Sequence, residues 1–178
     1  MKIYITGTTK GLGATMAASW AGQHEVIGLN RPEYNLDKDI KSYVKTDFDV
    51  YINNAYYNFA QTNLLYDLYE ANKHRKCQII NIGSVSSDTE RDAINPYVVH
   101  KLALDRACMQ LQLQDTDCKV ILVKMGRMDT PLVAHRVGYP KIATQHIVEY
   151  LNWIIHQPDN MLIKNLTIDQ LHSNRMVA

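Results

Sequence analysis

A glycine-rich turn near the start of the chain limits its possible folds more than any other feature. The turn, Thr6 to Gly13, follows a short apolar run that predicts a strand and precedes an alanine-rich run that predicts a helix, Ala14 to Ala21. Such a turn lets backbone N–H groups approach the pyrophosphate of a dinucleotide at the helix N-terminus. We therefore expect a nucleotide-binding βα unit; the alternative is a turn of the same kind that binds no ligand.

The rest of the chain alternates between apolar runs and amphipathic segments. The apolar runs predict strands at residues 25–30, 49–54, 78–84, 119–124 and 165–169. The segments between them predict helices at residues 36–45, 61–74, 96–114 and 144–156. Strands separated by helices form a parallel sheet with right-handed crossovers. We predict one domain over residues 1–178, a Rossmann-type doubly wound parallel α/β sheet with helices on both faces.

Composition and charge exclude several classes of protein. The chain has 178 residues, enough for a substantial core, and its 46% apolar and 21% charged residues are ordinary for a soluble globular protein. The net charge of +1 leaves no electrostatic footprint for nucleic acid. No segment reaches the roughly 18–20 apolar residues of a transmembrane helix, and no signal peptide is visible before the first strand. The three cysteines lack metal-site spacing. We expect a cytoplasmic protein with no metal, nucleic-acid or membrane partner.

Tyr97 and Lys101 stand four residues apart in a predicted helix, so their side chains share one face of it. An ammonium beside a phenol favours the phenolate and lowers the pKa of a tyrosine, which starts at about 10. A tyrosine with a lowered pKa can exchange protons near neutrality. Ser84 ends a predicted strand, and ligands of parallel sheets bind at the carboxyl ends of strands. The alternatives are a packing tyrosine, a solvated lysine and a serine that caps a turn.

These residues and three further motifs make the chain resemble a short-chain dehydrogenase/reductase, a family of NAD(P)-dependent oxidoreductases. The resemblance runs from Lys2 to about Pro131, in the family's order, and is carried by Thr6-Gly7-x-x-x-Gly11-x-Gly13, Asn53-Asn54-Ala55, Ser84, Tyr97-x-x-x-Lys101 and Gly126-x-x-x-Thr130-Pro131. The chain is short for this family, with only a brief segment between the second predicted strand and residue 49. We therefore predict that the family's third strand is missing or vestigial.

The resemblance implies four catalytic residues. Tyr97 would be the general acid/base that gives its proton to a carbonyl oxygen, and Lys101 would hold the nicotinamide ribose and lower the Tyr97 pKa. Ser84 would orient the carbonyl and stabilise developing oxyanion charge. The family's fourth residue is an asparagine on the helix before Ser84. Asn63 is the candidate for it, and an ordinary surface asparagine is the alternative.

The resemblance also implies which residues hold the cofactor. They are Gly7, Thr9, Lys10, Gly11, Leu12, Gly13, Asn30, Arg31, Asn53, Asn54, Ala55, Tyr97, Lys101, Gly126 and Thr130. Tyr56 replaces the family's glycine after Asn-Asn-Ala, and Met125 replaces its proline before Gly126, so we expect a crowded cofactor groove. The second strand ends in Asn30 and Arg31 rather than in the acidic residue that suits NAD. With Lys10 they favour NADP(H), and NAD(H) is the alternative.

Two functions follow from this interpretation. The first is an NADP(H)-dependent oxidoreductase that transfers hydride between nicotinamide and a small-molecule carbonyl or alcohol. The second, motivated by the missing strand, Tyr56 and Met125, is a non-catalytic nucleotide sensor or scaffold with a Rossmann core. An epimerase of the extended branch fits less well, because those proteins have a different glycine spacing and a large C-terminal substrate domain. His135 and Arg136 are candidates for binding an anionic substrate. Apolar positions on the helix that bears Tyr97 predict a homodimer or homotetramer.

Overall fold

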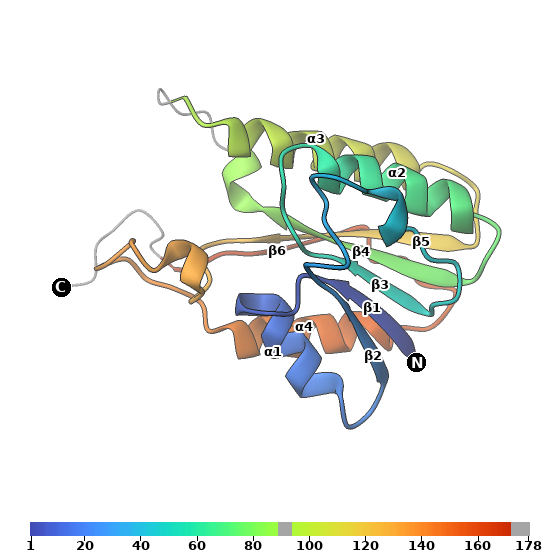
Figure 1. Cartoon of the computed structure of the whole chain (residues 1–178), viewed down its shortest axis with the longest axis horizontal. Helices are drawn as coiled ribbons and strands as arrows, with labels where there is room; N and C mark the ends of the chain where they lie inside the picture. Colours follow the sequence, from blue (N-terminus) through green and yellow to red (C-terminus); the bar gives the residue numbers. More distant parts are fainter. Residues whose placement is uncertain (89–93, 172–178) are drawn as a thin grey trace.

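Six strands form one fully parallel sheet in the order β2-β1-β3-β4-β5-β6 (Figure 1). A computed structural model describes residues 1–88 and 94–171 of the chain. The strand bounds are β1 Lys2–Thr6, β2 Glu25–Leu29, β3 Val50–Asn53, β4 Cys77–Ser84, β5 Cys118–Met125 and β6 Asn165–Ile168. The chain moves outward from β1 to β2 and then returns to the other side of β1 with β3. Such a switch point is where open α/β sheets bind their ligands, at the carboxyl ends of the strands.

In the described residues, four α-helices lie on the sheet, and they cover both of its faces, as predicted. Helices α1 (Gly11–Trp20) and α4 (Thr144–Ile155) lie on one face, and α2 (Ala60–Asn72) and α3 (Pro96–Leu111) lie on the other (Figure 1). The central strands are buried on both faces, which explains their continuous apolar runs. Alternate residues of one strand therefore enter different cores: Tyr51 of β3 packs under α2 and α3, whereas Val50 and Ile52 pack over α1 and α4. None of the helices in the described residues is long and apolar enough to cross a membrane.

The segment between β2 and β3 is described throughout and contains no strand, which confirms the predicted loss of the family's third strand. The helix predicted for residues 36–45 is wrong, because only a short 3-10 turn forms there, at Lys41–Tyr43. Asn35 and Asp39 accept hydrogen bonds from the backbone N–H groups of Asp37 and Ser42, at 3.1 and 3.3 Å. Such local turns compete with a helix. Leu36 and Tyr43 anchor the segment in the core beside α2.

Candidate active site

The glycine-rich turn leaves the carboxyl end of β1 and enters α1. Gly7 and Gly11 have φ angles of +73° and +59°, a region that glycine adopts without strain. A Cβ on Gly13 would lie 2.0 Å from the carbonyl oxygen of Gly7, so only glycine lets α1 pack this closely on the turn. Lys10, at the N-cap of α1, makes no side-chain cap. The first N–H groups of α1 are thus free of a side-chain cap, which suits a phosphate ligand.

Asparagine and threonine side chains hold the turn in this shape. Thr6 Oγ1 accepts the backbone N–H groups of Asn54 and Ala55 at 2.9 and 2.8 Å, and Asn54 Nδ2 donates to the Thr6 carbonyl at 2.9 Å. Asn30 Oδ1 accepts from the Thr8 N–H at 2.6 Å, and its Nδ2 donates to Thr8 Oγ1 at 2.7 Å. Asn30 and Asn54 are both predicted to contact the cofactor. In this structure their amides form hydrogen bonds within the protein and fix the turn.

The other predicted cofactor residues divide into exposed and buried groups. Thr9, Lys10 and Arg31 are exposed around the turn, whereas Leu12 is buried beneath it. Asn53 is also fully buried, and its Nδ2 donates to the Gln61 carbonyl and to Asn81 Oδ1, both at 2.9 Å. Asn53 therefore supports the site from within the sheet and has no surface to offer a ligand.

Gly126 and Thr130 follow the carboxyl end of β5. A Cβ on Gly126 would lie 2.1 Å from Asp169 Oδ1, so glycine at this position permits the close approach of the segment after β6. Thr130 lies against the glycine turn, since its Cγ2 is 3.4 Å from the position of a Cβ on Gly11. The structure thus brings Thr130 to the predicted cofactor groove, whereas Gly126 has a packing role.

Ser84, Tyr97 and Lys101 converge at the carboxyl edge of the sheet. Ser84 ends β4, Tyr97 lies in the first turn of α3, and Lys101 follows one turn later. Ser84 is close enough to Tyr97 to lower the pKa of its phenol, and Lys101 Nζ is 5.7 Å from the centroid of the Tyr97 ring. Ser84 Oγ is also 2.6 Å from Ser86 Oγ. The three predicted catalytic side chains are therefore neighbours in space.

Lys101 is buried with its charge held by two oxygen atoms. Only 3% of the residue is exposed, and its Nζ donates to Gln61 Oε1 and to the Ile82 carbonyl, each at 2.7 Å. Burial lowers the Lys101 pKa to about 7, against the opposing attraction of Asp105. This lysine therefore changes charge near neutral pH, unlike a solvated lysine.

Gln61 is the residue that sequence reasoning missed. Its Nε2 donates to the Asn53 and Ile82 carbonyls at 2.6 and 3.1 Å, which fixes Oε1 on Lys101. Asn63, the predicted fourth residue, is instead exposed and lines a separate cavity beside the segment 36–40. Residues two positions apart in a helix differ by about 200° around its axis, so Gln61 and Asn63 face different directions. The signal was present in the buried stripe of α2, where Gln61 is spaced correctly with Leu64, Leu65 and Leu68.

The prediction of an acidic Tyr97 is wrong for this state of the protein. Burial raises the pKa of Tyr97 above its ordinary value and outweighs the hydrogen bond from Ser84, which lowers it. Tyr56 and Asp105 raise this pKa further. The cause is the cover over the phenol, since a desolvated phenolate is less stable than a hydrated one.

Tyr56 provides much of that cover. Its ring meets the Tyr97 ring edge to face, with centroids 4.8 Å apart, and lies 5.6 Å from Lys101 Nζ. The Tyr56 hydroxyl is 2.7 Å from His100 Nδ1, and Phe59 packs edge to face on that imidazole with ring centroids 4.3 Å apart. The crowding expected from replacing the family's glycine is thus present. Tyr56 thus packs against Tyr97 and close to Lys101.

Comparison with known proteins supports the fold. No protein-family model matches the sequence, and no curated protein matches it. Solved structures match almost the whole chain at low identity. One is a short-chain dehydrogenase from Burkholderia cenocepacia in complex with NADP, at 19% identity and a TM-score of 0.75, covering 94% of this chain and 90% of that one. Another is a serine dehydrogenase in its closed form with NADP⁺, at 17% identity and a TM-score of 0.78, covering 94% of each chain.

A third match is the 3-ketoacyl-(acyl-carrier-protein) reductase from Brucella melitensis complexed with NADH. It is 16% identical, has a TM-score of 0.77, and the match covers 94% of this chain and 96% of that one. The fold is that of a nucleotide-binding α/β protein with one parallel sheet. More narrowly, the chain has the fold of the short-chain dehydrogenases/reductases, which confirms the predicted resemblance at the level of the fold.

Proposed function

We propose that the protein is an NADP(H)-dependent oxidoreductase of the short-chain dehydrogenase type, acting on a small-molecule carbonyl or the matching alcohol. The observation that carries the proposal is the convergence of Ser84, Tyr97 and Lys101 at the carboxyl edge of the sheet, the same edge from which the uncapped glycine-rich turn leaves β1. Either feature alone is common. A proton donor and a dinucleotide turn along one sheet edge are what carbonyl reduction requires.

The residues around the turn suit a dinucleotide at its phosphate end. The uncapped start of α1 at Gly11 would receive the pyrophosphate, and the exposed Lys10 and Arg31 would meet a ribose 2′-phosphate. No Asp or Glu stands at the end of β2 to accept a ribose 2′-hydroxyl, which supports NADP(H) over NAD(H). When bound, the nicotinamide supplies or accepts the hydride.

The side chains of this protein have distinct proposed tasks. Tyr97 gives its proton to the substrate oxygen during reduction, and Ser84 donates a hydrogen bond to the same oxygen. Lys101 holds ribose hydroxyls and, when protonated, favours the phenolate form of Tyr97. Gln61 positions Lys101 through its 2.7 Å contact and takes the place proposed for the family's asparagine. Tyr56 has to rotate away from Tyr97 before a ribose can approach Lys101.

The test measures NADPH oxidation with a panel of aldehydes, ketones and quinones, alongside NADPH binding by fluorescence. Tyr97→Phe should lower kcat by about 10²-fold or more, because the phenol oxygen is the proton donor, and should leave NADPH affinity within about twofold. Tyr66→Phe serves as the matched control. It removes the phenol of an exposed α2 residue whose hydroxyl lies 2.7 Å from Gln110 Oε1 of α3. Full activity in Tyr97→Phe would overturn the catalytic assignment.

A nucleotide sensor or scaffold is the second candidate, and the position of Tyr56 favours it. A ring packed on Tyr97 and over Lys101 would suit a protein that binds a nucleotide without turnover. The same assays separate the candidates. NADPH binding with no oxidation against any carbonyl in the panel supports the sensor. Oxidation that depends on Tyr97 supports the enzyme.

We propose further that the protein is a homodimer or homotetramer and works in the cytoplasm. Leu104, Cys108 and Leu111 of α3 are buried, whereas the neighbouring apolar residues Leu102, Met109 and Leu113 are exposed and available to a second copy. All three cysteines are free, which suits a reducing compartment. Sedimentation of the wild type against Leu102→Glu tests the assembly, and an unchanged mass would contradict it.

A further inference from the structure

Two of the three cysteines touch each other across neighbouring strands. Cys77 begins β4, Cys118 begins β5, and the two residues are register partners in the parallel ladder. Their Sγ atoms lie 3.5 Å apart, and both side chains belong to the core beneath α2 and α3. Both thiols are free. Two reduced sulfur atoms are thus in contact in a part of the protein that the proposed reaction does not use.

The backbone at this pair already has the spacing that a disulfide needs. Adjacent strands of a sheet lie about 4.8 Å apart, and the Cα atoms of bridged cysteines are about 4.4–6.8 Å apart. An S–S bond is about 2.05 Å long, so the two sulfur atoms have to approach by about 1.5 Å, which side-chain rotation can supply. The Asp117 N–H donates to the Lys73 carbonyl at 3.2 Å and joins the loops before the two strands. A disulfide can therefore form without rearrangement of the sheet.

Arg75 places a positive charge beside the thiols. Its guanidinium donates to Asn72 Oδ1 at 2.7 Å, which holds it near the amino edge of the sheet. The hydrogen bond with Cys118 lowers the pKa of Cys77 below its ordinary value, although burial opposes this effect. Arg75 lowers the Cys77 pKa further, and Asp49 raises it. Because the thiolate is the nucleophilic form of cysteine, Cys77 is the thiol that reacts first.

Small oxidants can reach this pair more readily than the third cysteine. Cys77 and Cys118 are each 5% exposed, whereas Cys108 is 0% exposed. Burial also raises the pKa of Cys108 above its ordinary value. Oxidation selects cysteines that have thiolate character and access to solvent. Cys77 has a measure of both properties, and Cys108 has neither.

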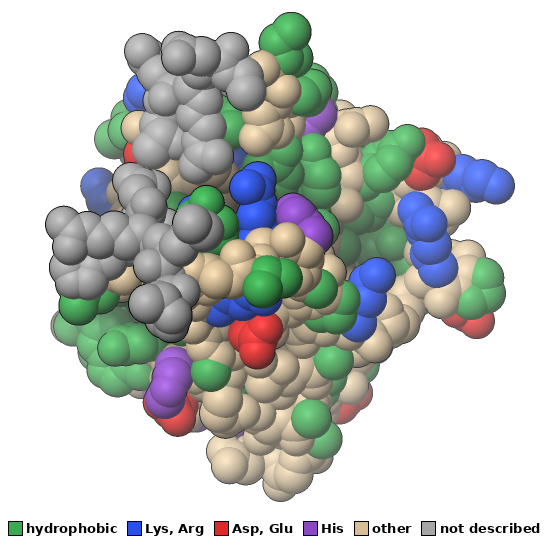
Figure 2. Space-filling view, turned by 90° about the vertical axis from the view of Figure 1, so that its left-hand side faces the viewer, with side chains coloured by type: hydrophobic (Ala, Val, Ile, Leu, Met, Phe, Trp, Pro, Cys, Tyr) green, Lys and Arg blue, Asp and Glu red, His purple; other side chains and the backbone are tan. Residues whose placement is uncertain are grey.

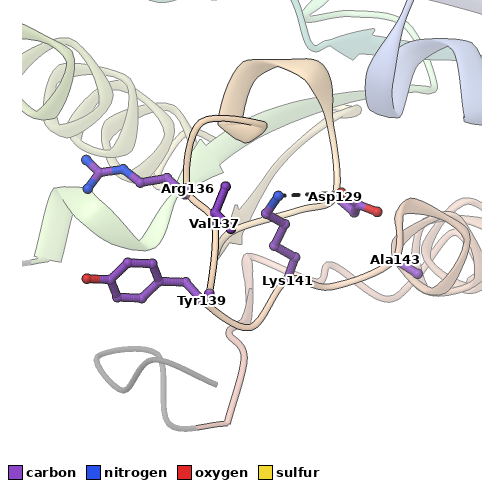
Figure 3. Close-up of a pocket in the computed structure, with 7 residues that line it drawn as sticks. Asp129, Arg136, Val137, Tyr139, Lys141 and Ala143 are labelled. Carbon is purple, nitrogen blue, oxygen red and sulfur yellow. Dashed lines mark ion pairs between the residues drawn. The ribbon is translucent and has the colours of Figure 1, made fainter. Parts of the chain in front are cut away.

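The thiol pair lies at the opposite edge of the sheet from the proposed active site. β4 is eight residues long, so about 23 Å of strand separates Cys77 from Ser84. Figure 2 views the carboxyl edge, with basic and histidine side chains near the middle of the face. The loop after β5 lies at that edge as well, and there Lys141 points toward Asp129 (Figure 3). Dissolved ions screen charges beyond about 10 Å at 0.1 M salt, so the charges of the carboxyl edge have little influence on the thiols.

We propose that Cys77 and Cys118 form an oxidation site, at which hydrogen peroxide converts the two thiols into a disulfide between β4 and β5. The inference is independent of the proposed oxidoreductase function. The disulfide links two strands whose register is already fixed, so the fold is the same in the reduced and oxidised protein.

The reaction has two steps and consumes one peroxide molecule. The Cys77 thiolate attacks one peroxide oxygen, the O–O bond breaks, and the other oxygen leaves as hydroxide, which takes up the proton of the Cys77 thiol and becomes water. The Cys118 sulfur then attacks the sulfenic acid at Cys77. The S–S bond forms, the S–O bond breaks, and the hydroxyl leaves as a second water with the Cys118 proton. Peroxide is reduced by two electrons, and the two thiols are oxidised by two.

The experiment treats the reduced protein with hydrogen peroxide and counts its free thiols in urea with a thiol-reactive chromophore. The count should fall from three to one and return to three after dithiothreitol. Peptide mapping without reduction then identifies the bridged residues. Trypsin leaves Cys108 and Cys118 in one peptide, residues 107–119, so a second protease that cleaves before Asp115 or Asp117 separates them.

Three serine substitutions assign the roles of the cysteines. Cys118→Ser should form no disulfide and should leave a sulfenic acid at Cys77, which dimedone traps. Cys77→Ser should form no disulfide and should lose thiols about tenfold more slowly, because the remaining thiol of the pair has little thiolate character. Cys108→Ser is the matched control, since it removes another buried thiol and should form the disulfide at the wild-type rate.

The exposed methionines report whether the peroxide dose is sufficient. Met109 and Met161 should become sulfoxides at that dose. Three remaining thiols in a protein with oxidised methionines would overturn the inference. A disulfide that includes Cys108, or one between two molecules, would overturn it as well. A bridge between Cys77 and Cys118 in the wild type supports the inference even where a serine variant does not fold.

Discussion

The two ends of the proposed dinucleotide groove differ in how their space is used. At the phosphate end, the start of α1 has no side-chain cap, Asn54 bonds to Thr6, and Asn30 bonds to Thr8. At the ribose end, Tyr56 covers Tyr97 and Lys101. The Lys101 ammonium already donates to Gln61 Oε1 and to the Ile82 carbonyl. The phosphate end is thus preorganised for a ligand, whereas the ribose end has to rearrange to admit one. Binding and chemistry therefore have separate structural requirements in this chain.

Substitution at Gly13 should damage the phosphate end most. Gly13→Ala places a Cβ 2.0 Å from the Gly7 carbonyl oxygen, so α1 has to move away from the turn. We expect the free energy of unfolding to fall by about 3 kcal/mol, with loss of NADPH binding. Urea denaturation measures the effect. Gly22→Ala is the matched control, because nothing lies within 4 Å of its Cβ, and its stability should change by less than about 0.5 kcal/mol. Equal effects at the two glycines would contradict the packing argument.

Substitution at Gln61 tests whether the ribose end depends on buried polar contacts. Gln61→Leu removes one of the two acceptors of Lys101 Nζ and should cost about 2 kcal/mol of stability, because a buried donor loses its partner. It should also lower the Lys101 pKa further and shift the pH profile of kcat to lower pH. Asn63→Leu, on the exposed side of α2, should leave both unchanged. A pH profile of kcat that is unchanged in Gln61→Leu would show that Gln61 only packs in the core and does not influence Lys101.

The buried Lys101 should make stability depend on pH. Its pKa is about 7 in the folded protein and near the ordinary lysine value when unfolded, so between these values the unfolded chain binds more protons. Stability should therefore rise with pH from about 7 toward about 10, by up to about 1.4 kcal/mol per pH unit, and should lack this contribution below pH 7. Urea denaturation of the wild type and Lys101→Met across this range measures the difference. Parallel curves for the two proteins would show that Lys101 titrates normally.

Removal of the Tyr56 ring should have the smallest effect of these substitutions. It should leave the ribose end of the groove as accessible to a ligand as the phosphate end. Tyr56→Gly takes away the ring over Lys101, so a ribose no longer has to displace it. We expect NADPH affinity to increase by about tenfold, measured by fluorescence titration, with Tyr97 remaining necessary for turnover. Phe59→Ala removes a neighbouring exposed ring that contacts His100, and it should leave affinity unchanged. Weaker binding in Tyr56→Gly would mean that the ring stacks on the cofactor.

The sequence predicted features of the backbone better than features of side-chain contacts. Strands β1 to β6, the helices on both faces and the missing third strand follow from apolar periodicity and from the length between motifs. The glycine turn was predictable because backbone shape there depends on glycine itself. The prediction of a helix at residues 36–45 was wrong because Asn35 and Asp39 form local turns, which apolar periodicity does not reveal.

The candidate site was predictable only in part. The spacing of Ser84, Tyr97 and Lys101 indicated their convergence, since strand ends and one helix face meet at a single edge. The prediction for Asn63 depended on the rotation of α2, which places Gln61 beside Lys101 and Asn63 on the exposed side. The direction of the Tyr97 pKa failed because burial under Tyr56 is a three-dimensional fact with no counterpart in motif spacing.

The loss of the third strand leaves β2 at the edge of the sheet, with Arg31 in the exposed segment that follows it. A nucleotide base beyond β2 would have little apolar wall to bury against, so its end of the cofactor would be held mostly by Lys10 and Arg31. Attraction between exposed charges weakens as dissolved ions screen it, over a distance of about 10 Å at 0.1 M salt. Cofactor uptake by this protein should therefore respond to ionic strength more than a buried adenine site would.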